Sequence, residues 1–207
     1  MATRQSIGVI VGTTRANRVG PQIVDFIADT IRAQRTSEKV DISIIDLHEW
    51  KLPFFDEPGV PSRIFDHNEY VHDHTKAWSR EIQKHDAFIF VSPQYNWGYP
   101  AVLKNAIDYL FNEWTGKPAM VVTYGGHGGG QCGTQLKTVL KGIKMAVIEK
   151  PVELTFPSRD IMVKAVTGQS IGLDASSDSA PWSSERETIV TAYDELLAAL
   201  SASKSKA

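Results

Sequence analysis

Several features that would support common protein classes are scarce or missing in this sequence. Cys132 is the single cysteine, so neither an intramolecular disulfide nor a cysteine-rich metal site can form. No stretch reaches the ~18 apolar residues of a membrane-spanning helix. The first residues, MATRQSIGVIVG, also lack the apolar core of a signal peptide. We therefore expect a cytoplasmic protein that has no membrane partner.

A strong excess of charge of one sign is also missing. The chain has 22 Lys and Arg against 24 Asp and Glu, a formal net charge of -2. Because binding to nucleic acid relies on a concentrated cationic surface, we expect no nucleic-acid partner. With 42% hydrophobic and 22% charged residues, the composition is that of an ordinary globular protein. The length of 207 residues predicts one domain, residues 1–207, large enough to bury its own core.

Short apolar segments alternate with segments of helical spacing. Strands are predicted at Ser6–Val11, Val40–Leu47, Asp86–Ser92, Pro118–Tyr124 and Met145–Thr155. Helices are predicted at 23–31, 75–84, 103–114, 135–143 and 185–200. Strands that alternate with helices pair in parallel through right-handed crossovers. The sequence thus predicts an α/β fold, a doubly wound five-stranded parallel sheet with helices on both faces.

Two segments do not fit this alternation. Residues 53–70 form a connection that is longer than most loops in compact domains, so it is expected to be functional or mobile. Residues 167–184 are rich in Ser, Asp and Gly and predict a surface linker before the last helix. We expect the core at about residues 6–156, followed by a C-terminal linker and helix at 157–207.

Three loops are predicted to meet at one edge of the sheet. They span residues 12–20, 93–100 and 125–133, and each follows a predicted strand. In open parallel sheets, ligands bind outside the carboxyl ends of the strands. We expect these loops to converge on one binding site.

The first loop, GTTRANRVG, suits an anion. Thr13 and Thr14 offer hydroxyl groups, and Arg15 and Arg18 offer guanidinium groups, just before a predicted helix. Helix N-termini favour anions, and arginine forms charge-assisted hydrogen bonds to phosphate oxygens. We interpret the loop as the site of a phosphate monoester. The alternative is a plain helix start with two solvated arginines.

The second loop, PQYNWGYP, suits a flat heterocycle. Gln94 and Asn96 can donate and accept hydrogen bonds, while Tyr95 and Trp97 can stack on a ring or wall it. Pro93 stiffens the start of the loop. The alternative is that the aromatic residues only fill the core beneath a turn.

The third loop, YGGHGGGQCG, is rich in glycine, which lets the backbone approach a ligand closely. We interpret Gly125 and Gly126 as a thin wall over a ring, with Tyr124 and His127 as polar contacts. The match to G-x-G-x-x-G further along this loop is weak, because it does not follow the first strand. The alternative is a simple flexible loop.

Other reactive side chains support no separate site. A histidine-containing segment matches no zinc signature, so we expect a solvated loop and no metal; its residues are Asp66, His67, His72, Asp73 and His74. Cys132 would need a base and a lowered pKa to act as a nucleophile. The neighbouring His127 is the candidate base in sequence, and we do not expect such a role.

Three motifs carry a resemblance to a known family. They are GTTRANRVG, SPQYNWGYPAVLKNAIDYLFNEW and GKPAMVVTYGGHGG, and they lie within residues 7–156. The chain resembles the NADPH-dependent FMN reductase family of flavodoxin-like proteins, and in particular its fungal FMN-containing NAD(P)H quinone reductases. The long central motif is the specific one.

The resemblance implies a cofactor and its placement. FMN would bind without a covalent link, with its phosphate at residues 13–18. Its ring would lie between the Pro93–Trp97 and Tyr124–Gly126 loops. NADPH or NADH would be the co-substrate and a small molecule, such as a quinone, the electron acceptor. The resemblance also implies a homodimer or a dimer of dimers.

On this basis we expect an FMN-dependent NAD(P)H:acceptor oxidoreductase that reduces quinones by two electrons in a ping-pong cycle. We name no catalytic residue, because the flavin carries the chemistry and the protein supplies position and electrostatics. Two alternatives remain open: a flavodoxin-type carrier of single electrons, and a non-catalytic FMN redox sensor or scaffold.

Overall fold

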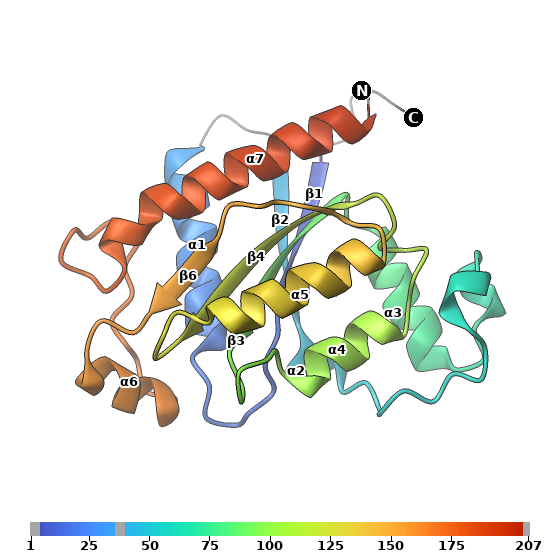
Figure 1. The fold of residues 1–207 in the computed structure, drawn as a ribbon, viewed down its shortest axis with the longest axis horizontal. Helices are drawn as coiled ribbons and strands as arrows, with labels where there is room; N and C mark the ends of the chain where they lie inside the picture. The colour runs from blue at the N-terminus through green and yellow to red at the C-terminus, as the bar shows by residue number, and fades with distance from the viewer. Residues whose placement is uncertain (1–4, 36–39, 205–207) are drawn as a thin grey trace.

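A twisted parallel sheet forms the middle layer of the protein (Figure 1). The computed structural model describes residues 5–35 and 40–204. The strands are β1 Gln5–Val11, β2 Val40–Asp46, β3 Ala87–Pro93, β4 Pro118–Gly125, β5 Ala146–Val147 and β6 Val152–Thr155. Their order is β2-β1-β3-β4-β5, with β6 also paired to β4. This 2-1-3-4-5 order is the flavodoxin-like one, and the paired strands of the described residues run parallel, as predicted.

The central strands are apolar on both faces because helices cover both. Every residue of β3 is buried, and so are the residues of β4 up to Tyr124. β1 pairs with β3 from Ile7↔Ala87 to Val11↔Val91. Continuous apolar runs of this kind are typical of buried parallel strands.

The predicted fifth strand is two short strands rather than one. β5 pairs with the start of β4 at Pro118↔Ala146, and β6 pairs with its end from Val122↔Val152. Pro151 lies between them and has no N–H to donate to a ladder. The apolar pattern was therefore right, but the strand prediction over Met145–Thr155 was wrong at its middle.

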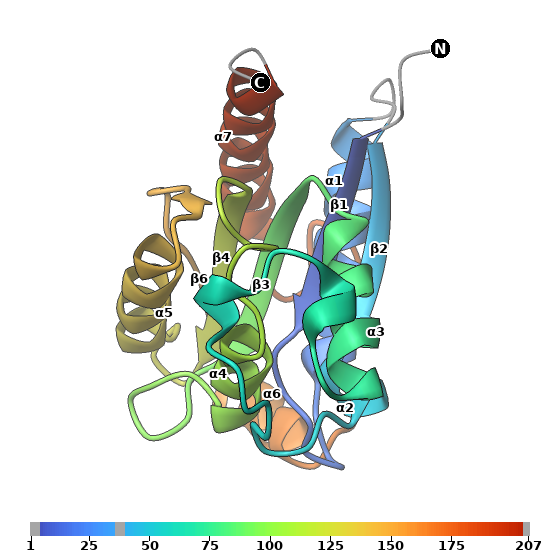
Figure 2. The ribbon, with the colours of Figure 1, turned by 90° about the vertical axis from the view of Figure 1, so that its right-hand side faces the viewer.

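The helices are divided between the two faces of the sheet (Figures 1 and 2). They are α1 Gly20–Gln34, α2 Leu47–Trp50, α3 Asp73–Gln83, α4 Ala101–Asp108, α5 Gly130–Gly142, α6 Arg159–Val166 and α7 Arg186–Lys204, with short 3₁₀ turns at Pro61–Arg63, His67–Glu69 and Ser183–Glu185. One core cluster joins α1 and α7 to the sheet, and a second joins α3, α4 and α5 to the opposite face. In the described part of the chain, no helix is long and apolar enough to cross a membrane.

Helix boundaries differ from the predictions at several points. α4 ends at Asp108 instead of continuing to Trp114. The apolar spacing there reflects burial within turns, where Leu110 and Trp114 donate N–H groups three residues back. α5 begins at Gly130 rather than Gln135. α2, with 4 residues, was not predicted because it is short, and α6, with 8 residues, was not predicted either.

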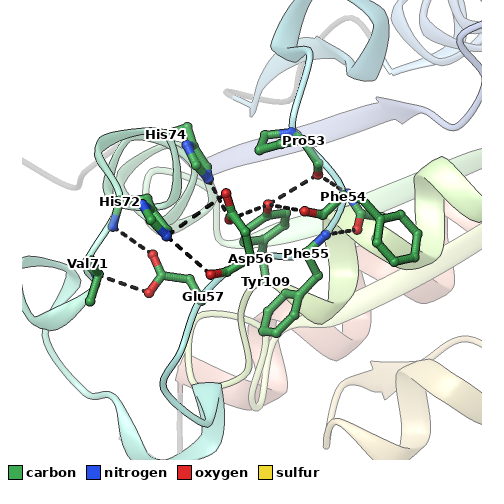
Figure 3. Close-up of polar contacts among 10 residues, drawn as sticks. Pro53, Phe54, Phe55, Asp56, Glu57, Val71, His72, His74 and Tyr109 are labelled. Atoms are coloured by element: carbon green, nitrogen blue, oxygen red, sulfur yellow. Dashed lines mark hydrogen bonds and ion pairs between the residues drawn. The ribbon is translucent and has the colours of Figure 1, made fainter.

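The long connection after β2 is held firmly against α4 (Figure 3). The Asn105 side chain donates to the Pro53 carbonyl at 2.7 Å and accepts from the Phe55 N–H at 2.8 Å. The Tyr109 hydroxyl donates to Asp56 Oδ1 at 2.9 Å. Asn105 thus holds the backbone on both sides of Phe54. The Phe54 residue itself is 86% exposed.

His72, the N-cap residue of α3, and His74 in the first turn of α3 contact the same connection (Figure 3). The rings of His72 and His74 stack 5.1 Å apart, and His74 Nε2 lies 3.0 Å from Asp56 Oδ1. Within the described ranges, no group of three or more His, Cys, Asp or Glu residues is arranged to hold a metal ion. The contacts of His72 and His74 with Asp56 anchor the connection to the start of α3.

Glu57 is the most buried carboxylate of this anchor. Its residue is 5% exposed, and its two oxygens accept the N–H groups of His72 at 2.9 Å and Val71 at 3.1 Å. Burial alone would raise the pKa of Glu57, but these hydrogen bonds outweigh it and hold the pKa below the ordinary value. The charged form is thereby favoured in the folded protein.

We predict that Glu57→Gln lowers the free energy of unfolding at pH 7 by about 1–3 kcal/mol, because charge-assisted hydrogen bonds to two amides are weakened. A carboxylate whose folded pKa is lowered stabilises the fold above its unfolded pKa and loses this effect as pH falls through the folded pKa. Urea unfolding from pH 7 to pH 3 should show the difference from wild type shrinking in acid. The exposed control Glu187→Gln should stay within about 0.5 kcal/mol, and a pH-independent difference would contradict the prediction.

Candidate functional site

The three predicted loops do converge at the carboxyl edge of β1, β3 and β4. Together with a C-terminal segment they enclose a cavity of about 140 Å³. Its lining residues are Thr13, Arg15, Arg18, Val19, Pro93, Gln94, Tyr95, Tyr124, Gly125, Phe156, Ala165 and Val166. The predicted residues Thr14, Asn96, Trp97 and Gly126 belong to the same loops but are not part of this lining.

The first loop is pinned from behind by an ion pair. Arg18 Nη2 lies 2.6 Å from Asp46 Oδ2 at the end of β2, and both side chains are largely buried. Arg18 Nη1 also donates to the Thr13 carbonyl at 3.2 Å. His48 Nδ1 donates to the Thr14 carbonyl at 3.2 Å, and the backbone N–H of His48 donates to Asp46 Oδ1. Arg18 is thus fixed at the cavity wall by Asp46, and the loop backbone is held in one shape.

Arg15 lies on the open side of the same loop. Its guanidinium carbon lies 5.2 Å from the centre of the Tyr95 ring, so this cation faces an aromatic surface. The Tyr95 hydroxyl and Thr13 Oγ1 are 2.7 Å apart and join the first loop to the second. These groups place one exposed positive charge and two hydroxyls at the cavity.

The start of α1 adds amide donors to these groups. Val19 is its N-cap residue, no side chain caps this end, and the first turn contains no acidic residue. An uncapped helix N-terminus directs N–H groups and the positive end of its dipole outward. Together with Arg15 and Arg18, it gives this side of the cavity the chemistry of an anion site.

The second loop contains a tight turn at its tip. Tyr95 and Gly98 exchange both backbone hydrogen bonds, N–H to carbonyl, at 2.8 and 2.9 Å. Asn96 and Trp97 between them have positive φ values of 46° and 68°. Positive φ at both central residues defines a type I′ turn, in which a bulky residue is strained.

The base of the second loop is held by Gln94. Its N–H donates to the Tyr124 carbonyl at 3.1 Å, and its Oε1 accepts the Cys132 N–H at 3.2 Å. Gln94 therefore links the second loop to the third and to the start of α5. Its side-chain oxygen is thus committed to a contact within the protein.

Cys132 itself is buried beneath this link. Its thiol lies 3.6 Å from Ser92 Oγ, and burial raises its pKa to about 11. A thiol at neutral pH that is shielded from solvent is a poor nucleophile. The expectation that Cys132 has no nucleophilic role agrees with this environment.

The glycines of the third loop fall into two groups. Gly128 and Gly129 have φ values of 73° and 87°, and a Cβ on Gly129 would lie 2.8 Å from Thr123 Cβ, so the fold requires glycine there. A Cβ on Gly125 would meet its nearest neighbour, Gln94 Cβ, at 3.9 Å, and one on Gly126 would meet Met162 Sδ at 3.7 Å. Internal packing therefore does not require Gly125 or Gly126.

Tyr124 points inward rather than toward solvent. Its residue is 5% exposed, and its hydroxyl would lie 3.2 Å from a Cβ on Gly20 at the start of α1. Burial, followed by the nearby Tyr95, raises the pKa of Tyr124 far above its ordinary value. Its hydroxyl therefore stays protonated and lies on the anion side of the cavity, next to the helix N-terminus.

His127, the other expected polar contact, lies on the outside. Its ring stacks on that of Trp97, with centres 6.4 Å apart and planes 20° from parallel. Trp97 is 64% exposed, and Gln135 Nε2 donates to its carbonyl at 3.2 Å. The stack bridges the tips of the second and third loops.

One wall of the cavity was missed in the sequence. Phe156, Ala165 and Val166 line it, and the last two belong to α6. The signal was Ser158, whose side chain caps α6 by accepting the Ile161 N–H at 3.2 Å. The predicted linker region after residue 156 thus contains a helix that closes the site.

A second cavity, of about 720 Å³, lies between the outer face of α1 and residues 170–176. Asp25, Asp29 and Asp174 line it, so an anion would meet negative charge there. The smaller cavity at the three loops is the better candidate for a phosphate-bearing ligand.

The chain is similar in sequence to known FMN reductases and quinone oxidoreductases. The family model for NADPH-dependent FMN reductase matches residues 6–155. The chain is 47% identical over 146 residues to the NAD(P)H-dependent FMN reductase LOT6 of Saccharomyces cerevisiae, covering 69% of this chain and 76% of that protein. It is 36% identical over 80 residues to NADPH:quinone oxidoreductase of Arabidopsis thaliana, covering 37% and 41% of the two chains.

A solved structure supports the fold. The flavoenzyme NAD(P)H:(acceptor) oxidoreductase FerB of Paracoccus denitrificans superimposes with a TM-score of 0.64 at 19% identity, covering 95% of this chain and 97% of that one. At this identity the likeness concerns the architecture.

We predict that Gly129→Ala and Gly125→Ala differ sharply in stability. Alanine at position 129 must adopt φ near 87° and crowd Thr123, which should cost about 1–3 kcal/mol of unfolding free energy. Alanine at position 125 has room and should change stability by less than about 0.5 kcal/mol. Urea unfolding of the two variants checks this, and equal losses would show that Gly125 also has a structural role.

Proposed function

Because the chain belongs to the NADPH-dependent FMN reductase family, we propose that it transfers two electrons from NAD(P)H through FMN to a quinone, in a ping-pong cycle. Membership in this family makes it an oxidoreductase that uses FMN with NAD(P)H. The acceptor and the kinetic order are the parts that we propose. The observation that carries the proposal is the joint cavity of the three loops, which is lined by the cations Arg15 and Arg18 and by the open Cβ position of Gly125.

The described residues suit FMN at both ends. We assign the phosphate to the Thr13–Arg18 loop, where Arg15 and Arg18 lie beside the uncapped start of α1. Thr14 belongs to this set through its place in the loop. The buried Tyr124 hydroxyl lies on the same side and can donate to a phosphate or ribityl oxygen.

The flat ring is assigned to the space between the second and third loops. Pro93, Gln94 and Tyr95 form one side of this space, and Asn96 and Trp97 lie at the tip of the same loop. We assign the opposite side to the backbone of Gly125, which lines the cavity, and of its neighbour Gly126. The open Cβ positions of the two glycines support this assignment, because a close approach of a ring explains glycine where packing does not.

The bound FMN supplies the redox chemistry by accepting two electrons and passing them on. The residues of the chain bind and orient it. Asp46 holds Arg18, Arg18 holds the Thr13 carbonyl, and the Thr13 hydroxyl contacts Tyr95, so the anion end and the ring end of the cavity are mechanically connected. Phe156 and the end of α6 line one wall of the cavity.

The quinone acceptor is supported by relatives, among them one named for NADPH:quinone oxidoreduction. A homodimer or dimer of dimers is also proposed. It is supported by apolar side chains left exposed on the anchored connection, since large exposed apolar patches often mark protein contacts. The most exposed of these side chains are Phe54, Phe65 and Val60, at 86%, 76% and 64%.

Two further expectations stand as proposals. One domain is supported by α7, whose buried residues share a core cluster with β1 and α1. A cytoplasmic location is supported by the single cysteine, which leaves no possibility of an intramolecular disulfide.

We predict that the purified protein binds FMN, and that anaerobic NADPH or NADH bleaches the flavin absorbance near 450 nm. Menadione added afterwards should restore the absorbance without NAD(P)H present, because the two half-reactions are separate in a ping-pong cycle. Stopped-flow absorbance measures both steps. Recovery only when both substrates are present would contradict the ping-pong order, and failure to bind FMN would contradict the assignment of the site.

We predict that Arg15→Ala weakens FMN binding by about 10- to 100-fold, because a charge-assisted contact to the phosphate is lost. Fluorescence titration of the apoprotein with FMN and with riboflavin measures the effect. Riboflavin has no phosphate, so its affinity should change little. Arg32→Ala, on the exposed part of α1 where Arg32 pairs with Asp29, is the matched control, and an unchanged FMN affinity of Arg15→Ala would remove Arg15 from the phosphate site.

A further inference from the structure

Trp97 occupies a position for which its side chain is poorly suited. It is the second central residue of the Tyr95–Gly98 turn, and its φ of 68° lies in the left-handed region. Type I′ turns favour Asn followed by Gly at these two positions, since a bulky side chain there is strained. Asn96 follows this preference and Trp97 does not.

Internal packing does not compensate for this strain. The Trp97 side chain belongs to neither core cluster and is 64% exposed. Among residues 5–35 and 40–204, its ring contact is the stack on His127, which is itself exposed. An exposed tryptophan in a strained conformation indicates a role outside folding, because strained residues concentrate at binding sites.

The position of the stack suggests what this role is. Trp97 lies two residues beyond Tyr95, which lines the cavity, and His127 lies two residues beyond Gly125, which lines it from the opposite loop. The indole and imidazole planes differ by 20° and the rings stack, so the imidazole lies against one face of the indole, while the Trp97 residue as a whole remains 64% exposed. The indole lies at the tip of the second loop, whose residues Pro93 to Tyr95 line the space that we assign to the flavin ring.

We propose that Trp97, supported by His127, is the platform on which the quinone acceptor stacks, and that it selects for flat, multi-ring quinones. An indole is electron-rich and a quinone is electron-poor, so their faces attract, and a two-ring quinone covers more of the indole than a small acceptor does. Trp97 is thus a specificity-determining residue. The inference rests on the proposed function of the same cavity.

The backbone strain at Trp97 allows a stability measurement that tests the argument without depending on activity. Trp97→Gly relieves the left-handed strain and Trp97→Ala keeps it, while both remove the ring. In the apoprotein, Trp97→Gly should therefore melt roughly 2–4 °C above Trp97→Ala. A lower melting temperature for Trp97→Gly would show that the turn is not strained at this position.

The second measurement compares acceptors on the FMN-loaded protein. For both variants, kcat/KM for menadione should fall about tenfold relative to kcat/KM for ferricyanide, which is not a flat ring, and the change should lie mainly in KM for menadione. Trp97→Phe keeps an aromatic face and should recover most of the ratio. His127→Ala should lower the ratio less than Trp97→Ala, because the imidazole supports the indole from one side.

Other roles of Trp97 give distinguishable results. A loss of FMN affinity in Trp97→Ala, with an unchanged acceptor ratio, would make Trp97 a cofactor contact and overturn the proposal. A change in molar mass by light scattering, with an unchanged ratio, would assign it to a subunit contact and also overturn it. An equal increase in KM for NADPH and menadione would overturn the selectivity for quinones. If the wild-type protein bound no FMN, the proposed function and this inference would both fail, whereas wild-type turnover with an unchanged ratio in the variants rejects the inference alone.

Discussion

The parallel register of β1, β3 and β4 is the constraint on which the rest of the site depends. Because the three strands run in the same direction, their carboxyl ends lie at one edge, and the loops that follow them have to meet there. Both faces of these strands are buried, so a slip by one residue would exchange the side chains that pack against the helices of the two faces; the packing against both helix layers therefore fixes the register. The hydrogen bonds between the loops then refine an arrangement that the sheet has already imposed.

Within this arrangement, the chain divides the work between residues that hold the loops and residues that remain open. Asp46 and His48 fix the first loop from behind, which leaves Arg15 as the cation on its open side. Gly128 and Gly129 are required by backbone conformation, whereas Gly125 and Gly126 are not. A site for a large flat cofactor needs both kinds of residue. Residues that hold the loops reduce the entropy lost when the cofactor binds, and the open positions provide the surface that the cofactor contacts.

The connection between residues 53 and 72 shows how a long loop can be rigid without regular structure. Asn105 and Tyr109 of the segment after β3 satisfy its backbone carbonyls and Asp56, and Glu57 accepts two of its amide groups (Figure 3). Buried polar groups of this kind are stable only when they are hydrogen-bonded. The same loop holds its backbone in place while the Phe54 side chain remains exposed to solvent.

The parallel α/β pattern, the three loops and the type of chemistry at each could be read from the amino acids alone, because they depend on local periodicity and on residues close together in the chain. Local rules could also have predicted the break at Pro151 and the early start of α5, although the apolar pattern concealed them. Which side of the cavity each group faces depends on the three-dimensional packing. Arg18 is separated from Asp46 by 28 residues and Thr13 from Tyr95 by 82, so their contacts arise from the packing of strands and leave no local signal. The place of α6 at the cavity and the inward direction of Tyr124 have the same origin, since a side chain's direction is set by the neighbours that the fold brings to it.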